Sequence, residues 1–284
     1  MEACAFMKSR TTKRRVGWYV GMSFVVAIFL FPIIWMAVAS LKPSSELFDI
    51  ARFSFFPKKF VSENYVRVLT KSRVPAYFLN SSIVALSATG ISVVVASLGG
   101  YAISRFRTLD MRILGLSCLA SQTIPGMMLV VPLFLFFKKL QLINTYQGLI
   151  LAHTTFSLPF SIWMLRSYFD SIPAELEEAA MIDGCSRFGI FWRIVFPLCA
   201  PGVVAVAIFS FMVSWNEFLF ALVLTQGERM RTLPIGIQNF ITQFQYEWGS
   251  LLASGSVATF PILILFLLLQ KYLVQGLTAG AIKE

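Results

Sequence analysis

Residues 171–197 read SIPAELEEAAMIDGCSRFGIFWRIVFP and separate two long apolar segments of the chain. The first half of this stretch places three glutamates among good helix formers, which predicts a short helix with acidic residues in its opening turns. Ser171 is placed to cap this helix, Pro173 lies near its first position, and Gly184 suits the left-handed residue that ends it. Ser186 is placed to cap a second helix. The stretch therefore predicts two short helices joined by a turn. They could lie on a membrane surface as an amphipathic connector or dock into a groove of another protein.

The composition places the rest of the chain in a membrane. Of the 284 residues, 57% are hydrophobic and only 13% are charged, which is about half the charged share of an average soluble domain. These values exclude a soluble globular protein, which keeps more charge on its surface, and a disordered one, which has fewer apolar residues. The net charge is +10, and we interpret the basic residues as neighbours of anionic lipid head groups, without a nucleic-acid partner.

Six stretches lack Asp, Glu, Lys and Arg, and each is long enough to cross a bilayer once as a helix. They are residues 16–41, 74–104, 113–137, 140–165, 194–216 and 248–270. Residues 218–224 are again apolar, so we expect the fifth helix to continue past Glu217 to about Thr225. The sequence predicts an all-α membrane protein with six transmembrane helices and a cytoplasmic helix-turn-helix loop between the fourth and the fifth.

The basic residues beside the first predicted span predict the orientation of the chain. Residues 1–15 form a basic segment with five Lys and Arg side chains directly before the first predicted span. Basic residues beside the first membrane helix favour the cytoplasmic side, so we expect both chain ends to be cytoplasmic. Residues 16–284 are predicted to form a single six-helix transmembrane domain, with residues 42–76 as an external loop and residues 171–197 as a cytoplasmic loop.

The sequence lacks the common motifs of nucleotide binding and hydrolysis. No GxxxxGK[ST] phosphate-binding loop and no GxSxG nucleophile turn occurs, and His153 is the single histidine. The cysteines, which are Cys4, Cys118, Cys185 and Cys199, show no CxxC spacing. We therefore predict no catalytic residue, no metal and no cofactor bound by this chain itself.

The loop of residues 171–197 resembles the EAA signature of permease subunits of ATP-binding cassette (ABC) importers. That signature runs EAA-x-x-DGA and, nine residues later, I-x-LP. The matching residues are Glu178, Ala179, Ala180, Asp183, Gly184, Ile194 and Pro197. This sequence has Cys185 where the signature has Ala and Phe196 where it has Leu. The signature also lies between the fourth and fifth of six spans in that family.

Other segments resemble the carbohydrate-type members of the same family, in particular the subunit called MalG in maltose transporters. These segments are residues 40–43 (SLKP), 64–65 (NY), 215–218 (WNEF) and 276–281 (GLTAGA). The resemblance covers nearly the whole chain from about residue 17. The tail after Gly276 is similar to the one that reaches toward the ATPase interface in this family.

The resemblance implies a set of partners. A permease of this family has no ATPase of its own; it pairs with a second permease subunit and binds a dimer of ATP-binding subunits that use ATP and Mg²⁺. An extracytoplasmic solute-binding protein delivers the solute. The resemblance thus implies a multi-pass protein of the bacterial or archaeal plasma (inner) membrane, surrounded by lipid.

The resemblance also implies an ATPase-coupling site in the loop. The loop would enter a cleft of an ATP-binding subunit, where Glu178 would face a basic residue and Gly184 would allow the turn to enter. Asp183 would cap the turn or contact the partner, and Ala179 and Ala180 complete the site. Closure of the ATPase dimer would then rotate the membrane helices and give alternating access.

Polar residues within the predicted spans are candidates for the substrate pathway, because burying them in a membrane is costly. Asn216 and Glu217, at the end of the fifth span, are the first candidates, and Gln122 in the third span is the next. A structural role is the alternative for each, through interhelical hydrogen bonds or, for Glu217, a position near the outer interface. Pro125 and Pro132 are expected to break or kink the third span, and Pro159 and Pro261 to do the same in the fourth and the sixth.

The function that the sequence favours is ABC-driven import of a saccharide or polyol. A phosphorylated solute such as glycerol phosphate is the alternative within this class, because sister permeases share the same motifs. An ion-coupled secondary transporter is the alternative of another class. It would need intramembrane acids for coupling, and Glu217 is the only candidate in the predicted spans.

Overall fold

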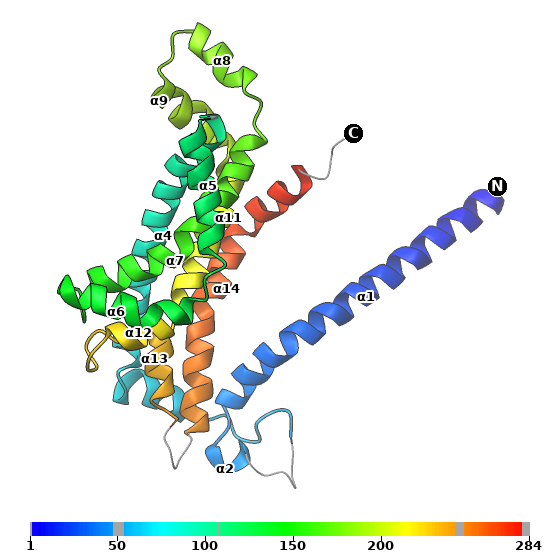
Figure 1. The fold of residues 1–284 in the computed structure, drawn as a ribbon. Helices are drawn as coiled ribbons and strands as arrows, with labels where there is room; N and C mark the ends of the chain where they lie inside the picture. Colours follow the sequence, from blue (N-terminus) through cyan, green and yellow to red (C-terminus); the bar gives the residue numbers. More distant parts are fainter. Residues whose placement is uncertain (1, 48–53, 107, 242–246, 280–284) are drawn as a thin grey trace. The chain divides into compact units, whose positions relative to one another are not determined.

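The computed structural model describes the backbone of residues 2–47, 54–106, 108–241 and 247–279, and the side chains of these residues except 2–16, 44 and 273–279. Throughout this part of the chain the regular elements are helices (Figure 1), which confirms the predicted all-α class. The α-helices are α1 (Glu2–Ser40), α2 (Ser44–Leu47), α3 (Glu63–Val66), α4 (Val74–Arg105), α5 (Leu109–Ser121), α6 (Val130–Lys139), α7 (Tyr146–Asp170), α8 (Glu175–Ile182), α9 (Arg187–Ile190), α10 (Phe196–Leu198), α11 (Ala200–Trp215), α12 (Leu219–Leu224), α13 (Leu233–Gln238) and α14 (Trp248–Ala279).

Four of these helices are long and apolar enough to cross a membrane singly. They are Gly17–Ser40 within α1, the whole of α4 and α7, and Trp248–Tyr272 within α14. Two bent pairs raise the number to six if each pair is one span: α5 with Gly126–Lys139, bent by 98°, and Arg187–Leu198 with α11, bent by 77°. Among the described residues, the six predicted spans thus correspond to four continuous helices and two broken ones.

The break in the third predicted span lies at Pro125. This residue has an extended backbone (φ −61°, ψ 123°) and precedes a short 3₁₀ turn that leads into α6. A proline supplies no N–H and crowds the preceding helical turn, so α5 cannot continue through it. Pro132 lies in the first turn of α6, where a missing N–H costs little.

The fifth predicted span ends earlier than expected. Its predicted continuation to Thr225 is wrong, because α11 stops at Trp215 and α12 is a separate short helix after the break. The two polar residues at the break are Asn216 and Glu217, and Glu217 uses its side chain to start α12 instead of extending α11.

Some predicted segments lie partly outside the described residues. Residues 48–53 of the external loop and residues 280–284 of the C-terminal tail are among these. The basic segment 1–15 has its backbone within α1 from Glu2 onward, but its side chains are outside the described set.

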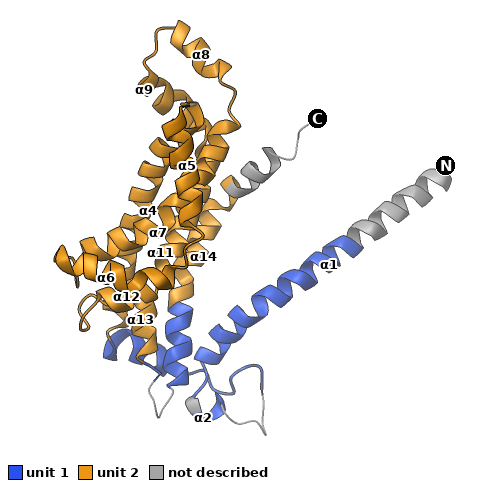
Figure 2. Cartoon of the chain, in the orientation of Figure 1, with its two compact units in different colours: residues 1–72, 240–257 blue, residues 73–239, 258–284 orange. Residues whose placement is uncertain are grey.

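The chain divides into two compact units (Figure 2). Unit 1 is residues 1–72 and 240–257, and unit 2 is residues 73–239 and 258–284. Helix α14 contributes to both units. The single transmembrane domain stays a prediction.

The centre of unit 2 is formed by α4, α7 and α11, which pack against one another (Figure 1). Small residues allow the close approach: a Cβ built on Gly100 of α4 would lie 3.0 Å from the backbone nitrogen of Arg166 and 3.1 Å from the carbonyl oxygen of Ile162 on α7. Serine pairs bridge the same helices, with 2.8 Å between the hydroxyls of Ser92 and Ser157 and 3.1 Å between those of Ser161 and Ser210. The serines satisfy one another in an apolar setting.

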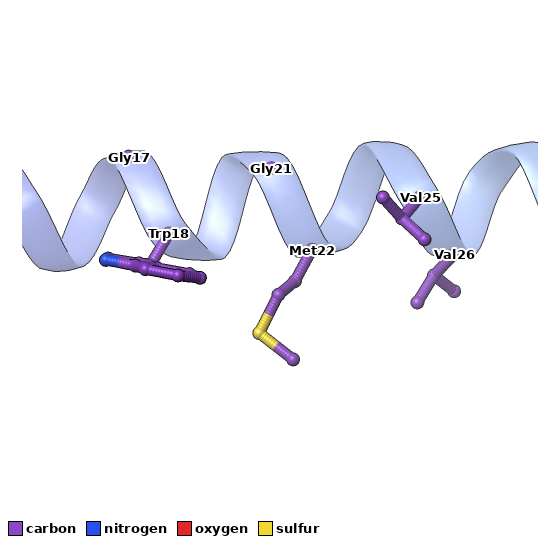
Figure 3. Close-up of a pocket in the computed structure, with 6 residues that line it drawn as sticks. All are labelled: Gly17, Trp18, Gly21, Met22, Val25 and Val26. Carbon is purple, nitrogen blue, oxygen red and sulfur yellow. The ribbon is translucent and has the colours of Figure 1, made fainter.

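In unit 1, α1 presents an apolar side that the other described residues of this unit do not cover. Trp18 and Met22 project from the same side of the helix (Figure 3), at 67% and 61% exposure. A shallow apolar hollow on this helix is lined by Gly17, Trp18, Gly21, Met22, Val25 and Val26. A helix that is apolar and exposed along its length is what lipid or a second membrane helix would cover.

Candidate functional site

The loop of residues 171–197 lies at one end of unit 2, beyond the ends of α4 and α5 (Figure 1). It holds α8, a turn and α9. Gly184, in the turn, has φ +81°, and nothing lies within 4 Å of a Cβ built on it. The glycine is therefore needed for its left-handed backbone and not for space, as predicted. Ser186 caps α9 by accepting a hydrogen bond from the N–H of Gly189 at 3.2 Å, also as predicted.

The predicted cap at Ser171 is wrong. α7 continues to Asp170, so Ser171 lies at the end of that helix and donates its hydroxyl to the carbonyl oxygen of Tyr168 at 2.7 Å. α8 begins later, after Ala174, and no side chain caps it. The sequence pattern did not reveal how far α7 extends beyond the membrane-length apolar stretch.

The candidate coupling residues fall into an exposed set and one buried residue. Glu178, Ala179, Asp183 and Gly184 are exposed. Ala180 is only 7% exposed and packs in an apolar cluster with Phe169 of α7 and other buried residues. The loop thus offers carboxylates and a turn to its surroundings while Ala180 fixes it to unit 2.

Large apolar side chains lie beside these exposed carboxylates. Ile182 is 87% exposed, Phe188 is 70% exposed and Met181 is 43% exposed. Such an exposed apolar group, bordered by acidic residues, is typical of a surface that contacts another protein or a membrane.

Sequence reasoning missed Glu177, which is the buried acid of α8. It is 7% exposed, and its Oε2 accepts a hydrogen bond from the Tyr101 hydroxyl at 2.7 Å. Its Oε1 pairs with Nε of Arg105 at 2.5 Å. The spacing held a signal, because Glu177 lies three residues before Ala180 and so shares its helix face. Glu177, Tyr101 and Arg105 border a cavity of about 230 Å³ between α4, α8 and α9.

Glu217, a pathway candidate, is occupied by contacts within the protein. Its two carboxylate oxygens accept the backbone N–H groups of Phe220 at 2.8 Å and Ala221 at 2.9 Å. Oε2 also lies 3.3 Å from Nε2 of His153, whose Nδ1 is 2.7 Å from the Ser214 hydroxyl. The carboxylate thus supplies acceptors for the first N–H groups of α12, which a helix start leaves unsatisfied. This geometry favours the structural alternative for Glu217.

Asn216 borders a cavity, unlike Glu217. The cavity measures about 200 Å³ and is lined by Trp215, Asn216, Leu233, Pro234, Ile237, Ala258, Thr259 and Ile262. Asn216 is exposed and donates to the carbonyl oxygen of Met212 at 2.9 Å, which leaves its amide oxygen available. Gln122 follows α5 at the break of the third span and is exposed, and it does not line this cavity.

In unit 1, two segments that are distant in sequence meet. The side-chain amide of Asn64 donates to the carbonyl oxygens of Ser40 at 2.8 Å and of Lys42 at 3.1 Å. The Tyr65 hydroxyl lies 2.7 Å from that of Ser40. Hydrogen bonds therefore join residues 40–43 (SLKP) to residues 64–65 (NY) at the end of α1.

Residues able to hold a metal are not grouped in this protein as far as it is described. Within the described ranges, no three or more His, Cys, Asp and Glu side chains lie together in a way that could hold a metal ion.

The helical architecture and the acidic loop belong to a known class of transport protein. The chain is a member of the family of binding-protein-dependent transport system inner membrane components, whose model matches residues 88–279. It is therefore a permease subunit of the kind found in ABC transporters.

Relatives and a solved structure narrow this class. The chain is 40% identical to the trehalose/maltose transport system permease protein MalG of Thermococcus litoralis, covering 95% of this chain and 97% of that one. It is 37% identical to the probable ABC transporter permease YurM of Bacillus subtilis, covering 95% and 92%. It is 39% identical to the sulfoquinovosyl glycerol permease SmoH of Agrobacterium fabrum, covering 93% of each.

A solved bacterial ABC transporter for import of the acidic polysaccharide alginate has a chain of the same fold. The TM-score is 0.78 at 22% identity, and the match covers 91% of this chain and 95% of that chain.

Proposed function

We propose that this chain is the permease subunit of an ABC importer that moves a saccharide or polyol across a bacterial or archaeal plasma membrane. The observation that carries the proposal is 40% identity, over 95% of the chain, to a trehalose/maltose permease. Other relatives are named for sulfoquinovosyl glycerol and for diacetylchitobiose. These solutes differ in size and charge but all contain sugar rings or a related polyol.

The helix-turn-helix of α8 and α9 is the proposed coupling loop. It would enter a cleft of an ATP-binding subunit on the cytoplasmic side, with both chain ends also on that side. Glu178 and Asp183 are exposed to meet basic groups, and the positive φ of Gly184 makes the turn narrow. Ile182 and Phe188 would be covered by the partner, which removes apolar surface from water.

Energy for transport would come from a dimer of ATP-binding subunits that use ATP and Mg²⁺. A second permease subunit would complete the pathway, and an extracytoplasmic binding protein would deliver the solute. Lipid or the second permease would cover the apolar side of α1. Closure of the ATPase dimer would be passed through the loop to the helices as alternating access.

A neutral solute is favoured over a phosphorylated one by the cavity at Asn216. Its lining includes the Asn216 amide, and it contains no Lys or Arg. Phosphate recognition normally uses such cations. Sugar hydroxyls can donate to a neutral acceptor such as the Asn216 amide oxygen, so Asn216 is the proposed pathway residue and Gln122 is a secondary candidate.

An ion-coupled mechanism has little support from the geometry. Coupling to an ion gradient needs an acid that can bind and release the ion. Both oxygens of Glu217 accept backbone hydrogen bonds from α12. If Glu217 bound an ion instead, the first N–H groups of α12 would lose their acceptors.

The test is purification of the chain from its native membrane in mild detergent, with mass spectrometry of the proteins that remain bound. We expect an ATP-binding subunit and a second permease with the native chain, and loss of the ATP-binding subunit alone with Gly184→Trp. Uptake of labelled maltose, trehalose and glycerol phosphate into reconstituted vesicles would then identify the solute class. A stable homo-oligomer that transports a sugar without any ATP-binding subunit would refute the proposal.

A further inference from the structure

The acidic residues of α8 do not share one environment. Glu175 and Glu178 are exposed, whereas Glu177 is only 7% exposed. An acid that docks to a partner should be accessible, so Glu177 has another task. Its two contacts, Tyr101 and Arg105, lie one helical turn apart on α4, at the end of that helix that meets the loop.

Arg105 joins α4 to the chain that enters the loop as well as to α8. Its Nε contacts Oε1 of Glu177, and its Nη2 donates to the carbonyl oxygen of Ile172 at 3.2 Å. The neighbouring Ser104 donates to Oδ1 of Asp170, the last residue of α7, at 2.6 Å. The end of α4 therefore binds residues 170–177, the segment that enters the loop, at three points.

Tyr101 also contacts the segment that leaves the loop after α9. Its ring centroid lies 5.7 Å from that of Phe169 on α7 and 5.0 Å from that of Phe191, which follows α9. The same residue thus touches α7, binds Glu177 of α8 through its hydroxyl and packs on the segment after α9. One turn of α4 therefore contacts the segment that enters the loop, its first helix α8, and the segment that leaves it after α9.

These contacts matter because α8 is too short to be stable as a helix without them. It has eight residues, and an isolated helix of that length is marginal in water. Ala180 adds apolar packing, which is non-directional and allows sliding. A charge-assisted hydrogen bond between Glu177 and Arg105 instead fixes both distance and direction.

We propose that Glu177, Arg105 and Tyr101 form a latch that makes the coupling loop and α4 move as one body. The inference rests on the proposed function, because it assigns to the loop a force from ATP-binding subunits. The latch residues are positioning residues: they transmit the displacement of the loop and do not touch solute or ATP. Without the latch, the ATP-binding subunits would still dock on the exposed face of α8, but their closure would move the loop against α4.

The test uses the complete transporter, reconstituted in lipid vesicles with its binding protein, and compares Glu177→Gln, Arg105→Gln and Tyr101→Phe with the native chain. The quantity measured is labelled maltose or trehalose taken up per ATP hydrolysed. We expect Glu177→Gln and Arg105→Gln to keep bound ATP-binding subunits but to lower this ratio at least tenfold. Tyr101→Phe keeps the ring and should lower it about two- to fivefold.

Asp110→Asn is the matched control, since it removes an exposed carboxylate in the first turn of α5, outside the latch and the coupling loop. It should leave the ratio unchanged. Combining Glu177→Arg with Arg105→Glu should recover part of the coupling lost by Glu177→Gln.

The outcomes separate the latch from the proposed function. If the native complex transports sugar with ATP and Glu177→Gln shows the native uptake per ATP, the latch is refuted and the function stands. If Glu177→Gln loses its ATP-binding subunits, Glu177 belongs to the docking surface and the latch is again refuted. If the native chain binds no ATP-binding subunit, the proposed function fails, and the inference fails with it.

Discussion

Unit 2 contains two largely buried glutamates, Glu177 and Glu217, whose carboxylates bind different kinds of partner. Glu177 binds the Arg105 and Tyr101 side chains, which lie 72 and 76 residues away in sequence. Glu217 binds the backbone N–H groups of the residues three and four positions ahead, and it approaches His153. One carboxylate therefore fixes the place of an element on another helix, while the other mainly defines where its own short helix begins.

The difference predicts which part of the molecule each residue controls. Loss of a long-range pair releases α8 from α4 and leaves Arg105, a largely buried cation, without its carboxylate. Loss of a local cap frays the start of α12, but the apolar packing of Phe220 and Ala221 still holds that helix. Changes at Glu177 should act on coupling, and changes at Glu217 on the local break.

The largest effect on stability is expected for Glu177→Ala. It removes one partner of a buried ion pair and leaves Arg105 without its carboxylate, which costs about 3–5 kcal/mol. The midpoint of thermal unfolding of the detergent-purified protein should fall accordingly. Glu175→Ala, an exposed neighbour on the same helix, is the control for the loss of a carboxylate. An equal, small shift in both variants would contradict the long-range role of Glu177.

A smaller loss of stability is expected for Gly184→Val. A β-branched residue at φ +81° costs about 1–2 kcal/mol or more in backbone strain, although the space around the turn is open. Gly227, also at positive φ (+72°) with open space around it, is the matched position for Gly227→Val. Both should lower the unfolding midpoint similarly, but only Gly184→Val should abolish ATP-driven uptake. Normal uptake by Gly184→Val would remove the turn from the coupling site.

Glu217→Gln should have a moderate effect. The amide keeps one acceptor oxygen and loses the other, so the start of α12 loses one hydrogen bond, worth about 0.5–2 kcal/mol. The apparent affinity for transported sugar should stay within about twofold of native, because a cap does not line the pathway, whereas Asn216→Ala should weaken it. A large change of affinity in Glu217→Gln, without loss of stability, would return Glu217 to the pathway.

Glu178→Arg should change stability least, within about 0.5 kcal/mol, because the residue is exposed. It should nevertheless remove the ATP-binding subunits from the purified complex, which Glu177→Gln should not do. Co-purification measured by mass spectrometry therefore distinguishes the docking acid from the latch acid. Retention of the ATP-binding subunits by Glu178→Arg would break this distinction.

Much of the fold follows from local patterns in the sequence. Apolar stretches of membrane length predicted the all-helical class and located the four continuous candidate spans and the two bent helix pairs. Pro125 predicted the break in the third span, whereas α7 and α14 continue unbroken through Pro159 and Pro261. The left-handed Gly184 and the Ser186 cap were also predicted, because backbone conformation and capping depend on neighbouring residues. The EAA-like signature, which is a local pattern too, correctly indicated the family of the chain.

Other features were decided by contacts between distant segments. The sequence could not show that α7 extends to Asp170, that α11 stops at Trp215, or that Glu177 and not Glu178 is buried. The sequence also could not show that Asn64 binds Ser40, or that Tyr101 contacts both Phe169 and Phe191. In a chain where 57% of residues are hydrophobic, apolar pattern gives the number of helices but not which faces meet. The partner of a buried charge is therefore set by packing, since only the folded chain places Arg105 beside Glu177.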